Sequence, residues 1–217
     1  MAEKIKANCT VISGAPDDDL EFIKKNIDIS SYIIAADSGY VKCKKIGIIP
    51  DLIIGDFDSS KKPNSDASDG IIQLEVEKAF TDTFTAIRYA VENGAEDITV
   101  FGAVGSRIDH TYSNILCLDY CKKHGVKCVI VNKHNRVSLI KGEGFINKDY
   151  QWFSLFAFLE DCKGVKISGA HYSEAFYNLD KMDINLGDQF AQSNFVENNF
   201  ATVTCEKGTL LLIESND

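Results

Sequence analysis

The sequence lacks the features that mark fibrous, membrane-spanning or disordered proteins. Only 3 of its 217 residues are proline, and no low-complexity tract interrupts it. No apolar stretch approaches the roughly 20 residues that a membrane-spanning helix needs. The residues from Met1 to Lys6 are charged and carry no apolar run of a signal peptide. With 45% hydrophobic and 25% charged residues, the composition is that of a globular chain, and we expect a cytoplasmic protein without a membrane partner.

Positive charge is also scarce. The chain has 23 Lys and Arg residues against 32 Asp and Glu residues, which gives a net charge of −9. Binding to nucleic acid without regard to sequence depends on Lys and Arg side chains that neutralise phosphates, so we expect no nucleic-acid partner. Small phosphorylated ligands are compatible with this balance, because a bound metal ion can screen their charge locally.

The cysteines show no pairing pattern. Their number is odd and they are spread over the chain, at Cys9, Cys43, Cys117, Cys121, Cys128, Cys162 and Cys205. Cys117 and Cys121 share one helical face, but no His and no second Cys pair completes a zinc site. We therefore expect reduced, buried thiols, as in cytosolic proteins.

The first part of the chain alternates short apolar runs with helical stretches. Strands are predicted at residues 9–13, 32–36, 52–54, 71–74, 97–101 and 127–131, and helices from Asp17, at 41–46, at about 82–93 and at about 110–124. Strands that are apolar throughout and separated by helices indicate parallel pairing with both faces covered. Residues 1–134 are therefore predicted to form an open, mostly parallel, Rossmann-like α/β domain.

After about residue 135 the pattern changes. Residues 152–159 are too few and too aromatic to favour a helix, and residues 201–206 alternate as a half-buried strand does. Lys207-Gly208 is a turn signal, and residues 209–213 read as the next strand. This pattern predicts a small antiparallel β-sandwich domain over residues 135–217.

Polar clusters follow several of the predicted strands. In open α/β sheets, ligands bind beyond the carboxyl ends of the strands, so these clusters are expected to meet. They are Asp37-Ser38-Gly39 after the second strand, Gly55-Asp56-Phe57-Asp58-Ser59 after the third, Thr81-Asp82 after residues 71–74, and Gly102 to His110 after residues 97–101.

The two aspartates of the second cluster are candidate metal ligands. Asp56 and Asp58 are two residues apart, so in an extended segment both carboxylates project to the same side. Mg²⁺ prefers oxygen ligands, and two crowded carboxylates need a cation or raised pKa values. A solvated acidic turn is the alternative. Thr81 is a candidate N-cap that places Asp82 in the first helical turn, where an aspartate commonly does no more than complement the helix dipole.

The cluster from Gly102 to His110 is suited to phosphate. Its glycines allow close backbone approach, and Arg107 can contact phosphate in a planar, two-pronged way. Asp109 could accept a hydrogen bond from a ribose hydroxyl or orient Arg107, and the alternative is a strand-to-helix turn with an internal Arg–Asp pair. His110 reads more simply as a helix-start residue than as a base. The chain has no Gly-Lys-Ser/Thr phosphate loop and no evident activated nucleophile. A metal on the aspartates together with Arg107 favours metal-assisted transfer of a phosphate-type group from a nucleotide.

In this order the clusters resemble the thiamin pyrophosphokinase family. The family pattern runs Ala-Asp-Gly-Gly, Pro-Asp-x-x-x-Gly-Asp-Phe-Asp-Ser, Lys-Asp-x-Thr-Asp and Gly-x-x-Gly-Gly-Arg-x-Asp-His. The corresponding residues here are 36–39, 50–59, 78–82 and 102–110, with Asn114 one turn further on and, in the C-terminal half, Ser193-Asn194 and residues 208–213.

The resemblance implies a nucleotide-binding α/β domain followed by a β-sandwich that binds thiamine and forms the dimer. Members of the family are homodimers with active sites at the junction of domains and subunits. Their reaction moves the β,γ-diphosphoryl group of ATP to the hydroxyethyl oxygen of thiamine and leaves AMP. ATP as co-substrate, Mg²⁺ as cofactor and thiamine as acceptor are therefore expected.

The resemblance also implies roles for individual residues. Mg²⁺ would be held by Asp56, Asp58 and Asp82, which with Arg107 form the expected catalytic set. The nucleotide would contact Asp37, Ser38, Gly39, Thr81, Gly105, Arg107, Asp109 and His110. Thiamine would contact Ser193, Asn194 and Tyr177.

The sequence departs from the family pattern at three positions. Ser38 and Ser106 replace glycines, which is a mild change. Ala79 stands where the family usually has an aspartate, and the loss of that carboxylate should weaken Mg²⁺ binding or shift the metal.

Three other functions remain open. A protein of the same fold could bind thiamine or nucleotide without turnover, which Ala79 favours. A metal-dependent nucleotide-sugar transferase would leave Arg107-x-Asp109 and the sandwich unexplained. A phosphatase of the haloacid dehalogenase type would need Asp-x-Asp near the first strand, and it ranks last.

Overall fold

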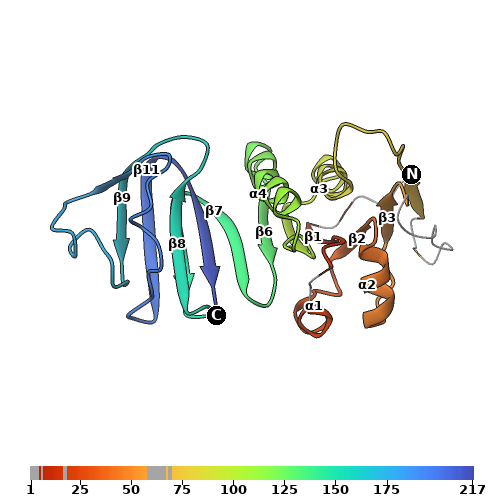
Figure 1. Cartoon of the computed structure of the whole chain (residues 1–217), viewed down its shortest axis with the longest axis horizontal. Coiled ribbons are helices and arrows are strands. Elements are labelled where there is room, and N and C mark those ends of the chain that lie inside the picture. Colours follow the sequence, from red (N-terminus) through yellow and green to blue (C-terminus); the bar gives the residue numbers. More distant parts are fainter. Residues whose placement is uncertain (1–4, 6, 17–18, 58–66, 68–69) are drawn as a thin grey trace. The chain divides into compact units, whose positions relative to one another are not determined.

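The chain forms two compact units, Met1–Lys133 and His134–Asp217 (Figure 1). The computed structural model describes residues 5, 7–16, 19–57, 67 and 70–217. No helix among these residues is long and apolar enough to cross a membrane. All seven cysteines are free, and all but Cys128 are buried.

The first unit contains a parallel sheet. Its strands are β1 (Asn8–Ile12), β2 (Tyr32–Ala36), β3 (Leu52–Gly55), β4 (Ile71–Gln73), β5 (Asp97–Phe101) and β6 (Lys127–Val131). They lie in the order β6-β5-β1-β2-β3-β4, and every pair is parallel. This confirms the α/β class expected from the alternation of apolar runs and helices.

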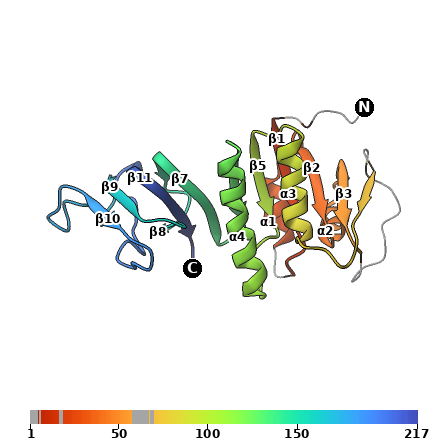
Figure 2. The same cartoon turned by 90° about the horizontal axis from the view of Figure 1, so that it is seen from above.

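Helices cover both faces of this sheet. They are α1 (Leu20–Asn26), α2 (Gly39–Ile46), α3 (Asp82–Glu92) and α4 (Ile108–Lys123). Figure 2 shows α3 and α4 on one face and α1 and α2 on the other. The central strands are therefore shielded on both sides, which is why Val11, Ile34 and Val100 are fully buried and why the strands read as continuous apolar runs.

The N-termini of the four helices differ in whether a side chain caps them. The Thr81 hydroxyl accepts a hydrogen bond from the backbone N–H of Phe84, which confirms the predicted N-cap of α3. Asp19 caps α1, while the earlier start predicted at Asp17 falls outside the described residues. At the N-caps of α2 and α4, both within the described part of the chain, no side chain makes a capping hydrogen bond. At the start of α2, the backbone N–H groups of Tyr40 and Val41 donate instead to the carbonyls of Asp37 and Ser38.

The second unit is antiparallel. Its strands are β7 (Asn135–Asn147), β8 (Trp152–Ala157), β9 (Cys162–Ser168), β10 (Met182–Ile184) and β11 (Phe200–Ser215). β11 pairs with β7 on one edge along its length, and on the other edge with β9 and then with β8. The unit has its own core, to which Phe153, Leu155, Val165, Val203 and Leu210 contribute. Its description as a β-sandwich stays a prediction.

The turn predicted at Lys207-Gly208 is wrong. β11 continues through these residues, and its register with β7 shifts between Cys205 and Leu210. Gly208 has φ of +100°, and a Cβ atom there would lie 2.7 Å from the carbonyl oxygen of Asp161. An irregularity of this kind bends a strand without ending it, so the same glycine signal marks a bulge.

Candidate active site

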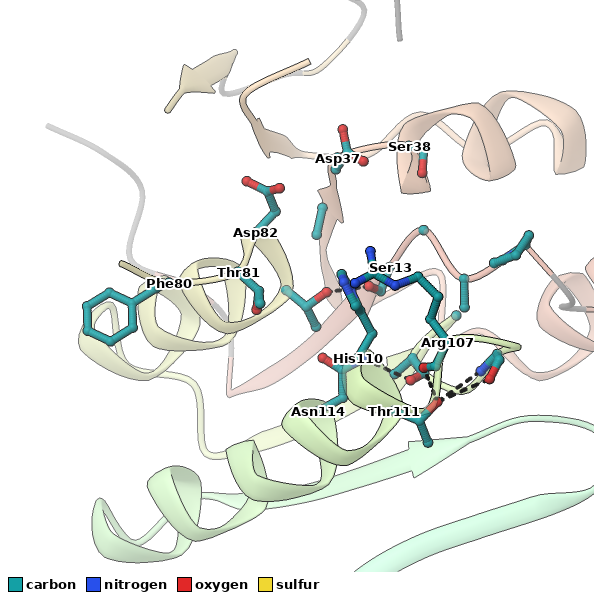
Figure 3. Close-up of a pocket in the computed structure, with 18 of the residues that line it drawn as sticks. Ser13, Asp37, Ser38, Phe80, Thr81, Asp82, Arg107, His110, Thr111 and Asn114 are labelled. Carbon is teal, nitrogen blue, oxygen red and sulfur yellow. Dashed lines mark hydrogen bonds between the residues drawn. The ribbon is translucent and has the colours of Figure 1, made fainter. Parts of the chain in front are cut away.

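A cavity of about 650 Å³ lies at the carboxyl ends of the parallel strands of the first unit. Its walls are the segments 13–16 after β1, 36–38 after β2 and 102–107 after β5, together with residues 76–83 around the start of α3 and residues on the first turns of α4. Figure 3 shows Asp37 and Ser38, Thr81 and Asp82, and Arg107 and His110 around one space. Three of the four clusters that were expected to meet therefore do so at this cavity.

Three carboxylates come together at this cavity. One oxygen from each of Asp37, Asp56 and Asp82 lies within 4.8 Å of the others. Asp37 follows β2 with φ of +46°, and its backbone N–H donates to the carbonyl of Ile54 at 2.8 Å. Asp58, the second residue of the predicted metal pair, lies outside the described residues. Asp37, which was expected at the nucleotide, lines the cavity and also lies beside Asp56 and Asp82, and its contact with a nucleotide stays a prediction.

This carboxylate cluster of Asp37, Asp56 and Asp82 has unmet bonding capacity. The Oδ1 atoms of Asp37 and Asp82 are buried and make no hydrogen bond to any described residue. Burial raises the pKa of Asp82, and the charges of Asp56 and Asp37 raise it further, against the effect of Lys78. Two buried carboxylate oxygens in one cluster therefore lack a partner among the described residues, and the cluster is suited to a cation.

Lys78 is the cation that the chain itself places there. Its ammonium group contacts Asp56 Oδ2 and lies 3.2 Å from Asp82 Oδ1, outside hydrogen-bonding geometry for the latter. Burial lowers the pKa of Lys78, but its contacts with Asp56 and Asp82 outweigh burial, and the pKa ends above its usual value. The sequence signalled Lys78 only as part of a motif.

The wall formed by α4 is suited to an anion. Asn114 is buried, and its Nδ2 donates to the carbonyl of Ala103 at 2.8 Å, which holds the loop after β5 against the helix. Arg107 lines the cavity and pairs with Asp109, with Nη2 to Oδ2 at 2.5 Å and Nε to Oδ1 at 3.2 Å. Both side chains are about two-thirds exposed, at 68% and 65%, so the pair is weak and Arg107 can exchange its partner for a phosphate.

The remaining residues expected at the nucleotide divide into two groups. Ser38, Thr81, Gly105 and His110 line the cavity, as Arg107 does. Asp109 is held at Arg107, and this contact lowers the pKa of its carboxyl group. Gly39 is buried beneath the cavity, where a Cβ atom would lie 1.9 Å from the carbonyl oxygen of Ile12. The absence of a side chain at Gly39 allows α2 to pack closely against β1.

The wall formed by residues 13–16 was missed at the level of sequence. The hydroxyl of Ser13 contacts that of Thr83, which ties the end of β1 to α3. The ammonium group of Lys42, on α2, donates to the carbonyl of Ala15 at 2.5 Å. The rule that ligands bind at the carboxyl ends of strands would have found this segment, because it follows β1 directly.

The residues expected at thiamine lie in the second unit. Asn194 is buried, and its amide group exchanges two hydrogen bonds with the backbone of Tyr172, at 2.9 and 2.8 Å. Ser193 is exposed with φ of +52°, and the hydroxyl of Tyr177 donates to the carbonyl of Phe190 at 3.2 Å. Asn194 thus holds the local backbone, and contact of these residues with thiamine stays a prediction.

Comparison with known proteins agrees with this geometry. The family model described as "Thiamin pyrophosphokinase, catalytic domain" matches residues 23–130. The chain belongs to the thiamin pyrophosphokinase family. It is therefore an enzyme of the transferase class. The residues matched to this family include Asp37, Asp56, Asp82 and Arg107, and all the residues that line the cavity except the segment 13–16 fall within the match.

Individual members of the family are similar over nearly the whole chain. The thiamine pyrophosphokinase of Bacillus subtilis (strain 168) is 29% identical over 214 residues, which cover 95% of this chain and 98% of the relative. The crystal structure of the thiamine pyrophosphokinase from Bacillus subtilis superimposes with a TM-score of 0.85 at 27% identity, over 97% of this chain and 99% of that one. The thiamin pyrophosphokinase from Geobacillus thermodenitrificans shares the fold with a TM-score of 0.81 at 24% identity, over 97% and 98% of the two chains.

Proposed function

We propose that this chain transfers the diphosphoryl group of ATP to thiamine in a Mg²⁺-dependent reaction, giving thiamine diphosphate and AMP. The observation that carries the proposal is the carboxylate cluster of Asp37, Asp56 and Asp82 in a cavity of the family's catalytic domain. Thiamine as acceptor and ATP as donor are inferred from the family relationship and from the similarity to the thiamine pyrophosphokinase of Bacillus subtilis.

The carboxylate cluster fits a divalent cation. It offers three oxygens within 4.8 Å of one another, and buried oxygens of Asp37 and Asp82 lack a hydrogen-bond partner among the described residues. Mg²⁺ takes hard oxygen ligands and leaves part of its shell to substrate phosphates. Asp37, Asp56 and Asp82 would hold it, and Asp58 is a fourth candidate. A bound Mg²⁺ would supply neutralisation of phosphate charge and orientation of the reacting groups.

The chain's own groups would position the nucleotide. Transfer of phosphate-type groups depends mainly on alignment and on charge stabilisation. Arg107 is the N-cap residue of α4 and lines the cavity, and Gly105, Ser38, Thr81 and His110 line it too. A helix N-terminus with a guanidinium group is suited to bind the phosphates that the metal does not contact.

Thiamine binding, assembly and location form the rest of the proposal. Ser193, Asn194 and Tyr177 would contact thiamine, and the double hydrogen bond between Asn194 and Tyr172 gives this segment a defined backbone. We propose a homodimer in the cytoplasm, in line with the family.

A second candidate is a protein of this fold that binds the same ligands without turnover. Ala79 favours it, because this exposed residue lines the cavity at a position where the family usually has a carboxylate. The two candidates differ in one product, since only the enzyme releases AMP in a thiamine-dependent manner.

The test is an AMP assay with purified full-length chain, ATP, MgCl₂ and thiamine, beside a reaction without thiamine. We expect thiamine-dependent AMP, and a loss of about 100-fold or more in Asp56→Asn, because a metal ligand and its charge are removed. Asp97→Asn is the matched control, since Asp97 is exposed at the amino end of β5, opposite the cavity. Full activity of Asp56→Asn would contradict the metal assignment, and ADP or phosphate in place of AMP would contradict diphosphoryl transfer.

A further inference from the structure

We propose that Lys78 is an internal counter-ion of the carboxylate cluster, which competes with the divalent cation for Asp56 and Asp82 and is released toward the nucleotide when the cation binds. This inference rests on the proposed function, because it assigns a role to one residue in loading the same site.

The contacts of Lys78 carry the first step. Its ammonium group touches Asp56 Oδ2 and lies 3.2 Å from Asp82 Oδ1, so it sits against two of the three clustered carboxylates. The Lys78 side chain is only 19% exposed, and that of Asp56 only 9%, which is a low exposure for groups with full charges. Charges that are removed from water to this extent are normally paired, and Lys78 is placed to provide that pairing.

Lys78 and a divalent cation compete because the space between the clustered carboxylate oxygens is small. A divalent cation such as Mg²⁺ binds carboxylate oxygens at about 2 Å. Asp56 Oδ2 already has the ammonium group in contact, and the third carboxylate oxygen is within 4.8 Å. Two cations on the same oxygens would also repel each other at short range in a partly buried site. Binding of the metal ion at Asp56 and Asp82 therefore requires Lys78 to leave.

The released ammonium group has a destination in the same cavity. Lys78 is among the residues that line it, together with Arg107 and the start of α4. A lysine acts as a mobile point charge on a flexible stem, and phosphate is a preferred partner. When a nucleotide is present, its phosphates can accept the ammonium group that the metal displaces. Metal and nucleotide are then expected to strengthen each other's binding, and the coupling is reciprocal.

The direction in which removal of Lys78 changes metal affinity distinguishes a competing counter-ion from a residue that only maintains the shape of the site. If Lys78 only maintained the shape of the carboxylate cluster, its removal would weaken metal binding. If Lys78 competes with the metal ion, removal of its charge tightens metal binding in the absence of nucleotide. It also reduces the gain that the nucleotide provides, because the phosphates can still bind the metal ion but no ammonium group remains to be transferred to them.

The experiment measures Mg²⁺ binding to the full-length chain by calorimetry, without nucleotide and then with a non-hydrolysable ATP analogue. In Lys78→Met, which keeps the length of the side chain, we expect the Kd for Mg²⁺ without nucleotide to fall at least about tenfold. Lys78→Arg keeps the charge and should remain close to the wild type. The matched control is Lys181→Met, since Lys181 forms an exposed ion pair with Glu206 in the second unit.

A fall in stability does not obscure the result. Lys78→Met removes the ammonium group from two of the clustered carboxylates, so its melting temperature should drop in EDTA and recover in Mg²⁺ more than that of the wild type. If the variant must be purified in Mg²⁺, competition with a chelator gives the Kd. A Kd for Lys78→Met that equals or exceeds the wild-type value overturns the inference and leaves the proposed metal site intact. Absence of Mg²⁺ binding to both proteins overturns the metal site and the inference with it.

Discussion

Replacement of Gly39 by alanine tests the packing that places Asp37 and Ser38 at the cavity. Gly39 is the first residue of α2, and a Cβ atom built on it would lie 1.9 Å from the carbonyl oxygen of Ile12 and 2.8 Å from its carbon. Both atoms belong to the backbone of β1, in the middle of the sheet. In a helix without such a neighbour, alanine in place of glycine would stabilise the fold by about 0.5–1 kcal/mol.

The clash outweighs this gain. Ordinary contacts of a Cβ atom begin at 3.4 Å, so α2 and β1 would have to separate by 3.4 − 1.9 = 1.5 Å. Overpacking of a well-packed core costs about 1–3 kcal/mol, and a contact with rigid backbone belongs at the upper end. After the helix gain is subtracted, we expect the free energy of unfolding to fall by about 2 kcal/mol and the melting temperature by about 4–8 °C.

The measurement is urea unfolding followed by far-UV circular dichroism, with Gly47→Ala as the control. Gly47 ends the same helix with φ of +77° and would have no atom within 4 Å of a new Cβ, so only the left-handed backbone is penalised, by about 1 kcal/mol. Gly39→Ala should also weaken Mg²⁺ binding, because Asp37 precedes the displaced helix. A Gly39→Ala variant as stable as the wild type would refute the close approach of α2 to β1.

Three further substitutions are expected to act through single contacts. Arg136→Met strips buried Glu214 of two hydrogen bonds at 2.6 Å, and urea unfolding should show a loss of about 3–5 kcal/mol, whereas a loss below about 1 kcal/mol would show that the pair is not needed. Asn114→Ala leaves the buried carbonyl of Ala103 without its partner, and the same assay should show a loss of about 1–3 kcal/mol, with no change arguing against this contact. Ala79→Asp adds a carboxylate to the cavity wall and should tighten Mg²⁺ binding or raise the rate of AMP release, while reduced activity would mean that the site has adapted to alanine.

The location of the cavity could be predicted from the sequence, but not all of the contacts between the side chains at the cavity. The apolar runs at residues 32–36 and 97–101 have the same bounds as β2 and β5, and the polar residues that follow them do line the cavity. That Asp37 turns toward Asp56 depends on its left-handed backbone and on the pairing of β2 with β3, which are properties of the assembled sheet. The contact of Lys78 with two carboxylates likewise arises only when the segment before α3 meets the end of β3.

The second unit shows why a local signal can mislead. Lys207-Gly208 has the composition of a hairpin turn, and a sequence alone cannot distinguish such a turn from a bulge in a longer strand. The pairing of the strand distinguishes the two, because β11 pairs with β7 both before and after the irregularity. The long strand β7 has only three buried residues, Val137, Ile140 and Ile146, without a period of two, and this weak pattern gave no strand signal.

The central place of β11 in the second unit has a consequence for the order of folding during synthesis. β7, β8 and β9 all pair with β11, yet β11 is the last strand of the unit to be made. The first unit, by contrast, has every strand of its sheet once Val131 has been synthesised. A nascent chain can therefore close the core of the first unit before β11 has been made. At that stage the second unit still lacks the strand with which β7, β8 and β9 pair. Domains that fold one after another in this way keep fewer unpaired strand edges exposed at one time, which lowers the risk of aggregation during synthesis.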